Sequence, residues 1–125
     1  MGDTCDSSQI APSAQRADVV VHECTLPDEM AQLAPARGHS SPTMAGTFAK
    51  AIAAKRLVLT HFSARYTSNS GEVSKRRISS LPFSKLADLF AQNVGIEALV
   101  EAAASAFRGP VLAAHDFLQL HLPRL

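Results

Sequence analysis

The sequence predicts an α/β fold, and three segments carry that prediction. Residues 18–23 (DVVVHE) and 57–62 (LVLTHF) are short runs rich in apolar and β-branched residues, as in strands that are buried on both faces. Between them lies a segment with helical patterning at 42–54. The order strand, helix, strand is typical of a parallel βαβ unit.

The helix between the two strands has a clear start and one apolar side. Ser41 and Pro42 precede it, and serine is a preferred N-cap while proline suits the first helical position. Met44, Phe48 and Ile52 follow at intervals of four residues, so they share one face of the helix. That face is expected to pack on the sheet.

The rest of the chain is interpreted in the same way. Residues 26–38 contain two prolines and a glycine and predict a loop with a short helical turn at 28–33. Residues 67–80 (TSNSGEVSKRRISS) are rich in serine and basic residues and predict a flexible loop. Apolar residues at helical spacing predict a helix over 84–107, and the alternating tail predicts a half-buried strand over 111–122.

Composition limits the class of protein. The chain has 125 residues, which is one domain or a piece of one. Its formal net charge of +1 gives no basic surface signal, so RNA binding has to be argued from a site. No apolar run reaches the ~18 residues of a membrane span, and no signal peptide is visible. We therefore expect a soluble cytoplasmic or nuclear protein, and an organelle stays open because the sequence does not establish Met1 as the true start.

Cysteine chemistry contributes little to the interpretation. Cys5 and Cys24 form no CxxC pair and have no metal-ligand spacing. Both are predicted to be reduced thiols of an intracellular protein.

Two short motifs near the start of the chain contain acidic residues that could carry chemistry. The first is GDT at 2–4, where Asp3 taken alone is most simply a turn residue. The second is HECT at 22–25, at the carboxyl end of a predicted strand, where ligands bind in sheets of this kind. Alternate strand residues point to opposite faces, so only one of His22 and Glu23 can face a site.

Two further motifs each place a histidine next to a predicted element. In GHSSP, His39 precedes the capped helix, and an acid role for it needs a carboxylate nearby, for which Glu23 is the candidate. In LTHFSARY, His61 ends a predicted strand and Arg65 follows, with a forked guanidinium suited to phosphate. Taken singly, each histidine is as readily a loop or core residue.

Taken together and in this order, GDT, HExT, GHSSP and LTHFSARY resemble the motifs of tRNase Z, of the metallo-β-lactamase superfamily. The similarity is strongest over 38–66 and is closest to the short form of that family. It implies that residues 1–125 are a partial domain, the C-terminal half of an αββα sandwich. The implied activity is that of a zinc-dependent endoribonuclease that removes the 3′ trailer of precursor tRNA.

The resemblance also implies roles for individual residues. Asp3 would bridge two zinc ions, and His61 would be a terminal ligand to one of them. Glu23 would orient His39, which would donate a proton to the leaving oxygen, and Arg65 would contact the scissile phosphate or help hold that pair. The implied products are a tRNA with a 3′-hydroxyl and a trailer with a 5′-phosphate. A homodimer is expected for the complete enzyme.

Part of the family's metal-binding set is not in this sequence. The motif HxHxDH does not occur, so only Asp3 and His61 remain as expected ligands, and two ligands leave zinc short of four-coordination. Asp3 is also expected to fray, because no strand precedes it. We therefore expect the chain alone to be inactive. An isolated half-sandwich exposes a sheet edge, which predicts marginal stability or association.

Two other functions stay open at this point. The chain could be a non-catalytic interaction partner that docks on a full-length homologue. It could also come from another hydrolase of the superfamily that acts on small phosphodiesters or other esters. The succession of GHSSP and HFSARY argues against this last alternative.

Overall fold

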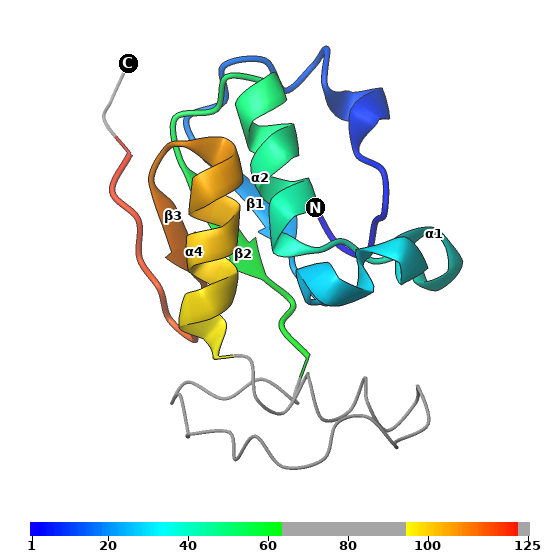
Figure 1. The fold of residues 1–125 in the computed structure, drawn as a ribbon. Helices are drawn as coiled ribbons and strands as arrows, with labels where there is room; N and C mark the ends of the chain where they lie inside the picture. The colour runs from blue at the N-terminus through cyan, green and yellow to red at the C-terminus, as the bar shows by residue number, and fades with distance from the viewer. Residues whose placement is uncertain (64–94, 123–125) are drawn as a thin grey trace, which may run out of the picture.

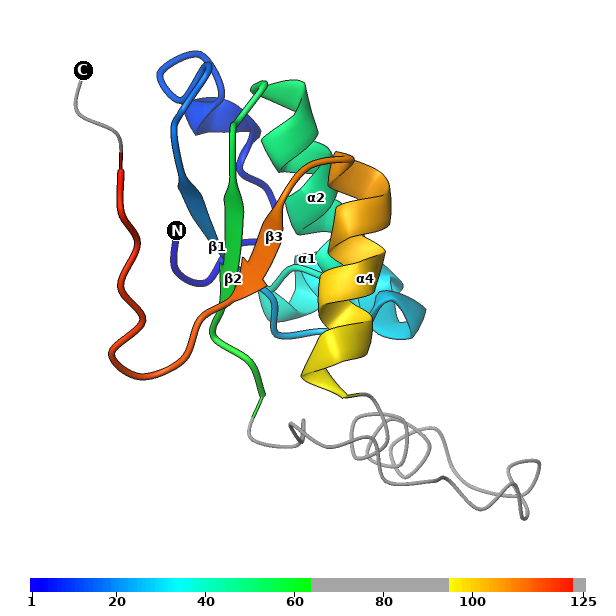
Figure 2. The same cartoon turned by 90° about the vertical axis from the view of Figure 1, so that its left-hand side faces the viewer.

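The computed structural model describes residues 1–63 and 95–122, which form a sheet covered by helices on one face (Figure 1). The sheet is parallel, with the strand order β1 (Val20–Glu23), β2 (Leu57–Thr60), β3 (Val111–Ala113). Figure 2 shows α2 (Pro42–Ala51) and α4 (Ile96–Phe107) together on one side of these strands. The predicted α/β class is thus confirmed.

The predicted βαβ unit is present as β1, α2 and β2. Val20 pairs with Leu57 and Glu23 pairs with Thr60 in a parallel register. Both strands are shorter than predicted, but they lie where the apolar runs placed them. Their carboxyl ends therefore reach the same edge of the sheet, and this edge carries the residues of the candidate site.

α2 begins where the sequence predicts and ends earlier than residue 54. The Ser41 side chain accepts a hydrogen bond from the Met44 amide at 3.5 Å. A second capping contact comes from Asp28, whose carboxylate accepts from the Thr43 amide at 3.0 Å and from its hydroxyl at 2.7 Å. The helix stops before Ala53, which has a left-handed backbone with a φ of 51°.

Short helical segments connect these elements. The predicted turn at 28–33 is confirmed as the 3-10 helix η2 (Asp28–Leu33), which leads into α1 (Ala34–Arg37). Gly38 ends α1 with a φ of 67°, a left-handed conformation that glycine adopts without steric cost. Another 3-10 turn, η1 (Ser8–Ile10), lies in the N-terminal segment.

The hydrophobic core lies between the sheet and the two long helices. Its largest apolar members include Ile52, Leu57, Leu59, Leu99 and Phe107.

The helix predicted over 84–107 is confirmed only in its second half. α4 spans Ile96–Phe107, and Gly95 before it is extended, with a φ of −70° and a ψ of 153°. The helix therefore does not continue through Gly95, in keeping with the low helix propensity of glycine. Residues 84–94 and the predicted serine-rich loop at 67–80 lie outside the described residues.

The strand predicted over 111–122 is wrong beyond Ala113. The Ala114 amide still donates to the Leu59 carbonyl at 2.7 Å, and the chain then turns, with a left-handed φ of 63° at Phe117. Leu118 and Leu120 remain half-buried between exposed residues, so the alternation is real. It reflects one-sided burial of an extended segment that does not belong to the sheet.

The prediction that the strands are buried on both faces is confirmed for β2, where Leu57, Val58 and Leu59 are all buried, and is wrong for β1, where Val21 is exposed. Strand alternation puts Val21 and Leu112 on the face opposite their core-facing neighbours Val20 and Val111, and both are exposed. They share one row of the sheet, since Val21 and Leu112 both pair with Val58. Among residues 1–63 and 95–122, no helix has the length and apolar character that crossing a membrane requires.

Candidate active site

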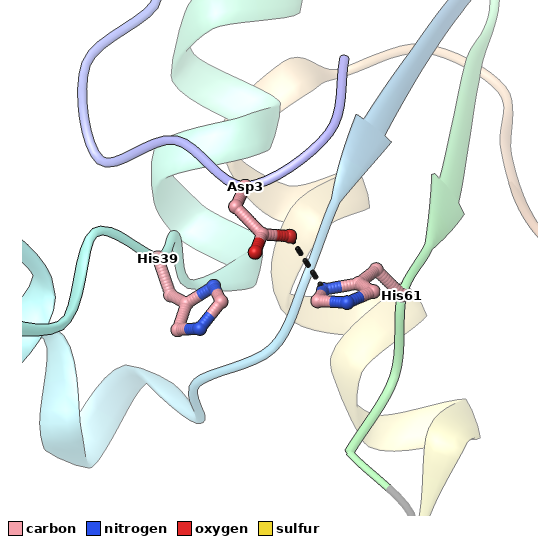
Figure 3. A group of neighbouring side chains, drawn as sticks. All are labelled: Asp3, His39 and His61. Atoms are coloured by element: carbon pink, nitrogen blue, oxygen red, sulfur yellow. Dashed lines mark ion pairs between the residues drawn. The ribbon is translucent and has the colours of Figure 1, made fainter.

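The candidate site lies at the carboxyl edge of β1 and β2. Glu23 ends β1, His61 directly follows β2, and His39 precedes α2. Asp3 reaches the same place from the N-terminal segment. Figure 3 shows Asp3, His39 and His61 converging from three separate parts of the chain. The structure thus brings together four of the five residues predicted for the site, and the fifth, Arg65, lies outside the described residues.

Glu23 holds three segments of this edge together. Its side chain is fully buried, and both carboxylate oxygens accept hydrogen bonds. Oε1 accepts from the amides of Thr4 at 3.3 Å and Ser40 at 2.5 Å. Oε2 accepts from the amide of Thr25 at 2.9 Å and from its hydroxyl at 2.7 Å. Hydrogen bonds to an ionised acceptor are among the stronger ones, so the carboxylate fixes the loops that carry the neighbouring site residues.

The segment that carries Asp3 is anchored. Besides the bond from the Thr4 amide to Glu23, the Ser40 hydroxyl donates to the Thr4 carbonyl. The expected fraying of Asp3 is therefore not what the structure shows, because side chains of two other segments hold the next residue. The Asp3 carboxylate itself is largely exposed, and its Oδ1 lies 3.3 Å from Nδ1 of His61.

His39 lies beside Glu23, as predicted, but no hydrogen bond joins the two side chains. Nδ1 of His39 is 3.5 Å from Oε1 of Glu23. This nitrogen is buried and has no hydrogen-bond partner among the described residues. The reason is that Oε1 is already occupied by two backbone amides. The imidazole ring of His39 instead tilts against that of His61, with the ring centroids 5.6 Å apart.

Thr25 is the residue that the sequence analysis did not single out. Its hydroxyl lies 2.7 Å from Glu23 Oε2 and 2.9 Å from His61 Nδ1. It therefore links the buried carboxylate to the exposed imidazole. His61 also has a left-handed backbone, with a φ of 57°, which is uncommon for a residue other than glycine and occurs at functional sites. The sequence did contain an indication of the contact between Thr25 and Glu23. Thr25 is the last position of HExT, two residues after Glu23, and residues two apart in an extended chain point to the same side.

His22 points away from the site, as strand alternation predicts. Its Nδ1 lies 2.8 Å from the Glu23 carbonyl and its Nε2 lies 3.1 Å from the Ser7 hydroxyl. Burial lowers the pKa of His22, because the charged imidazolium is poorly solvated there. This histidine is thus a buried structural residue, held neutral between two hydrogen-bond partners.

The remaining histidines and the cysteines lie elsewhere. His115 and His121 belong to the segment after β3 and are exposed. Cys24 is fully buried in the core, where burial raises the pKa of its thiol to about 12, so it stays protonated at neutral pH. Cys5 is partly buried in the N-terminal segment.

No family model matches the chain. Among solved structures it is similar to the metallo-β-lactamase fold protein YhfI from Bacillus subtilis, with a TM-score of 0.61 at 21% identity, over 90% of this chain and 34% of that protein. It is also similar to human tRNase Z, short form, with a TM-score of 0.60 at 28% identity, over 99% of this chain and 32% of that protein. The class is therefore the metallo-β-lactamase fold, as predicted, present in part.

Curated relatives lead to a particular family within that class. Ribonuclease Z of Acaryochloris marina is 35% identical over 122 residues, which is 98% of this chain and 32% of that protein. Zinc phosphodiesterase ELAC protein 1 of Homo sapiens is 60% identical over 50 residues, which is 40% of this chain and 14% of that protein. The resemblance to tRNase Z is thereby confirmed. The chain spans less than a third of the length of these relatives.

Proposed function

We propose that this chain is the C-terminal part of a zinc-dependent endoribonuclease that removes the 3′ trailer of precursor tRNA. The observation that supports it best is the convergence of Asp3, Glu23, His39 and His61 at one edge of the sheet. These residues come from the four motifs that the chain shares with tRNase Z. The human relative is named a zinc phosphodiesterase. The side chains at this edge offer imidazole nitrogen and carboxylate oxygen, which are common zinc ligands.

In the complete enzyme, Asp3 and His61 would hold zinc. When bound, zinc activates water and stabilises charge on a phosphate. His39 would donate the proton that the leaving oxygen needs, a step that contributes roughly 10²–10⁴ in rate. Glu23, whose Oε1 lies 3.5 Å from Nδ1 of His39, would orient that ring, and its hydrogen bonds keep the loops in place.

The partners in this proposal are precursor tRNA and a second copy of the complete enzyme. The chain alone would be inactive, because three donors from Asp3, His39 and His61 do not supply both a two-zinc site and a free proton donor. The missing ligands would come from a segment with HxHxDH.

A chimera tests the proposal. In the Acaryochloris marina relative, the aligned 122 residues are replaced by this chain, and the product is incubated with a precursor tRNA that bears a 3′ trailer. We expect trailer removal, a loss of about 10²–10⁴ in rate for His39→Gln, and no change for the matched control His115→Gln. A folded, zinc-loaded chimera whose rate equals that of its His39→Gln variant would refute the role given to this site.

A second candidate function is favoured by the outer face of the sheet. Val21 and Leu112 are exposed there in one row of the sheet, as in a surface that another protein layer covers. The chain would then be a non-catalytic partner of a full-length homologue. Co-purification with such a homologue, abolished by Val21→Lys but not by the site variant His39→Gln, would favour this alternative. Independence of binding from Val21 would count against it.

A further inference from the structure

Three side chains that could hold a metal ion, not two, meet at the candidate site. Asp3, His39 and His61 each offer one donor atom, and these three atoms lie within 4.8 Å of one another. Motif reasoning assigned only Asp3 and His61 to a metal and gave His39 the role of proton donor. The structure places His39 in the same group as the other two (Figure 3).

The separation of these donors fits a single zinc ion. Zinc binds histidine nitrogen and carboxylate oxygen at about 2.0–2.2 Å, so two donors of a tetrahedral shell stand about 3.3–3.6 Å apart. Asp3 Oδ1 and His61 Nδ1 already stand 3.3 Å apart, and side-chain rotations that shift donor atoms by about an ångström would bring the most widely spaced pair to the tetrahedral separation. Asp3 and His61 have side chains 63% and 51% exposed, so an ion can enter from solvent.

The backbone that carries these donors is held in advance by Glu23. Its bonds reach Thr4, next to Asp3, and Ser40, next to His39. Thr25 extends the same network to the imidazole of His61. Ligands whose orientation is fixed by such outer contacts bind metal more tightly. The buried Nδ1 of His39 makes no hydrogen bond among the described residues, and Oε1 of Glu23 lies 3.5 Å from it.

We propose that the chain by itself binds one zinc ion through Asp3, His39 and His61, with water as the fourth ligand. His39 is then a ligand in this state and not a proton donor. Three protein ligands and an open position form a stable tetrahedral shell. The inference goes beyond the proposed function, because it concerns the chain without any completing segment and requires no RNA.

Calorimetric titration of the purified 125-residue chain with zinc chloride tests it. We expect one zinc per chain, and a loss of affinity of at least about tenfold in Asp3→Asn, His39→Gln and His61→Gln, since losses of 10–100-fold follow even from changes to outer contacts. Cobalt(II) in place of zinc should give the visible absorption of a four-coordinate ion, reduced in the same variants. His115→Gln and His121→Gln are the matched controls and should bind as the parent does.

A second variant separates metal binding from folding. Thr25→Val keeps all three ligands and removes the hydroxyl that contacts His61, and we expect about tenfold weaker binding with an unchanged far-ultraviolet circular dichroism spectrum. Parent-like affinity in His39→Gln, or no zinc bound by the parent chain, would overturn the inference. The chimera assay gives an independent result. The chimera can cleave RNA even if the isolated chain binds no zinc, and it can fail to cleave RNA even if the isolated chain binds zinc.

Discussion

Glu23 should determine the stability of the site edge, and Glu23→Gln tests this directly. The carboxylate is fully buried and accepts four hydrogen bonds, from Thr4, Ser40 and, twice, Thr25. A glutamine offers one acceptor oxygen and one NH2 group, so one of the two oxygen positions becomes a donor. In either orientation at least one buried backbone N–H loses its acceptor.

The magnitude follows from these bonds. A buried donor without a partner costs about 1–3 kcal/mol. Each of the two hydrogen bonds that remain is weaker by about 1 kcal/mol, because its acceptor is no longer a charged carboxylate. The expected loss in free energy of unfolding is therefore about 3–5 kcal/mol. For a chain of this size that lowers Tm by about 10–20 °C.

Urea unfolding followed by circular dichroism measures the effect. The control is Glu29→Gln, the same chemical change at an exposed position of η2. If Glu23→Gln does not fold at all, Thr25→Val removes only one bond to the carboxylate and should cost about 1–2 kcal/mol. A free energy of unfolding for Glu23→Gln within about 0.5 kcal/mol of that for Glu29→Gln, the range of an ordinary surface substitution, would contradict this role of the carboxylate.

Three further substitutions have predictable effects on stability. Gly46→Ala should cost about 1–3 kcal/mol in urea unfolding, because the new Cβ would overlap the Ala103 carbonyl of α4, and an unchanged midpoint would contradict that packing. Arg108→Gly should add about 0.5–1 kcal/mol, since Arg108 ends α4 with a left-handed φ of 61°, and a loss of stability would show that its side chain matters more than its backbone. Because the pKa of His22 is lowered in the folded chain, the unfolded chain binds a proton on this histidine at a higher pH than the folded chain does. The free energy of unfolding should therefore fall as the pH drops below about 6.5. His22→Gln should flatten this dependence on pH, while His115→Gln should not.

The sequence predicted the βαβ unit because each of its signals is local. The Ser41-Pro42 cap and the apolar runs at β1 and β2 specify elements whose neighbours along the chain are also their neighbours in space. The prediction of a strand was wrong at the tail. The alternation of Leu118 and Leu120 indicates which side of the segment is buried, but it does not indicate whether a partner strand is present. Hydrogen-bond pairing is non-local, so periodicity alone cannot reveal it.

The candidate site was predicted at the level of residue types and less well at the level of contacts. The pairing of Glu23 with His39 was expected, and the two side chains are neighbours, but the backbone amides of Thr4 and Ser40 occupy the carboxylate instead. Backbone donors carry no sequence signature, so motifs could not show this competition. Nor could they show that His39 lies within metal-binding reach of Asp3.

The central claim is tested most directly by the ends of the RNA that the chimera with the Acaryochloris marina relative produces. We expect a tRNA that ends in a 3′-hydroxyl and a trailer that begins with a 5′-phosphate, with both products formed about 10²–10⁴-fold more slowly in His39→Gln. Products with a 2′,3′-cyclic phosphate, or cleavage that persists unchanged in His39→Gln, would contradict it.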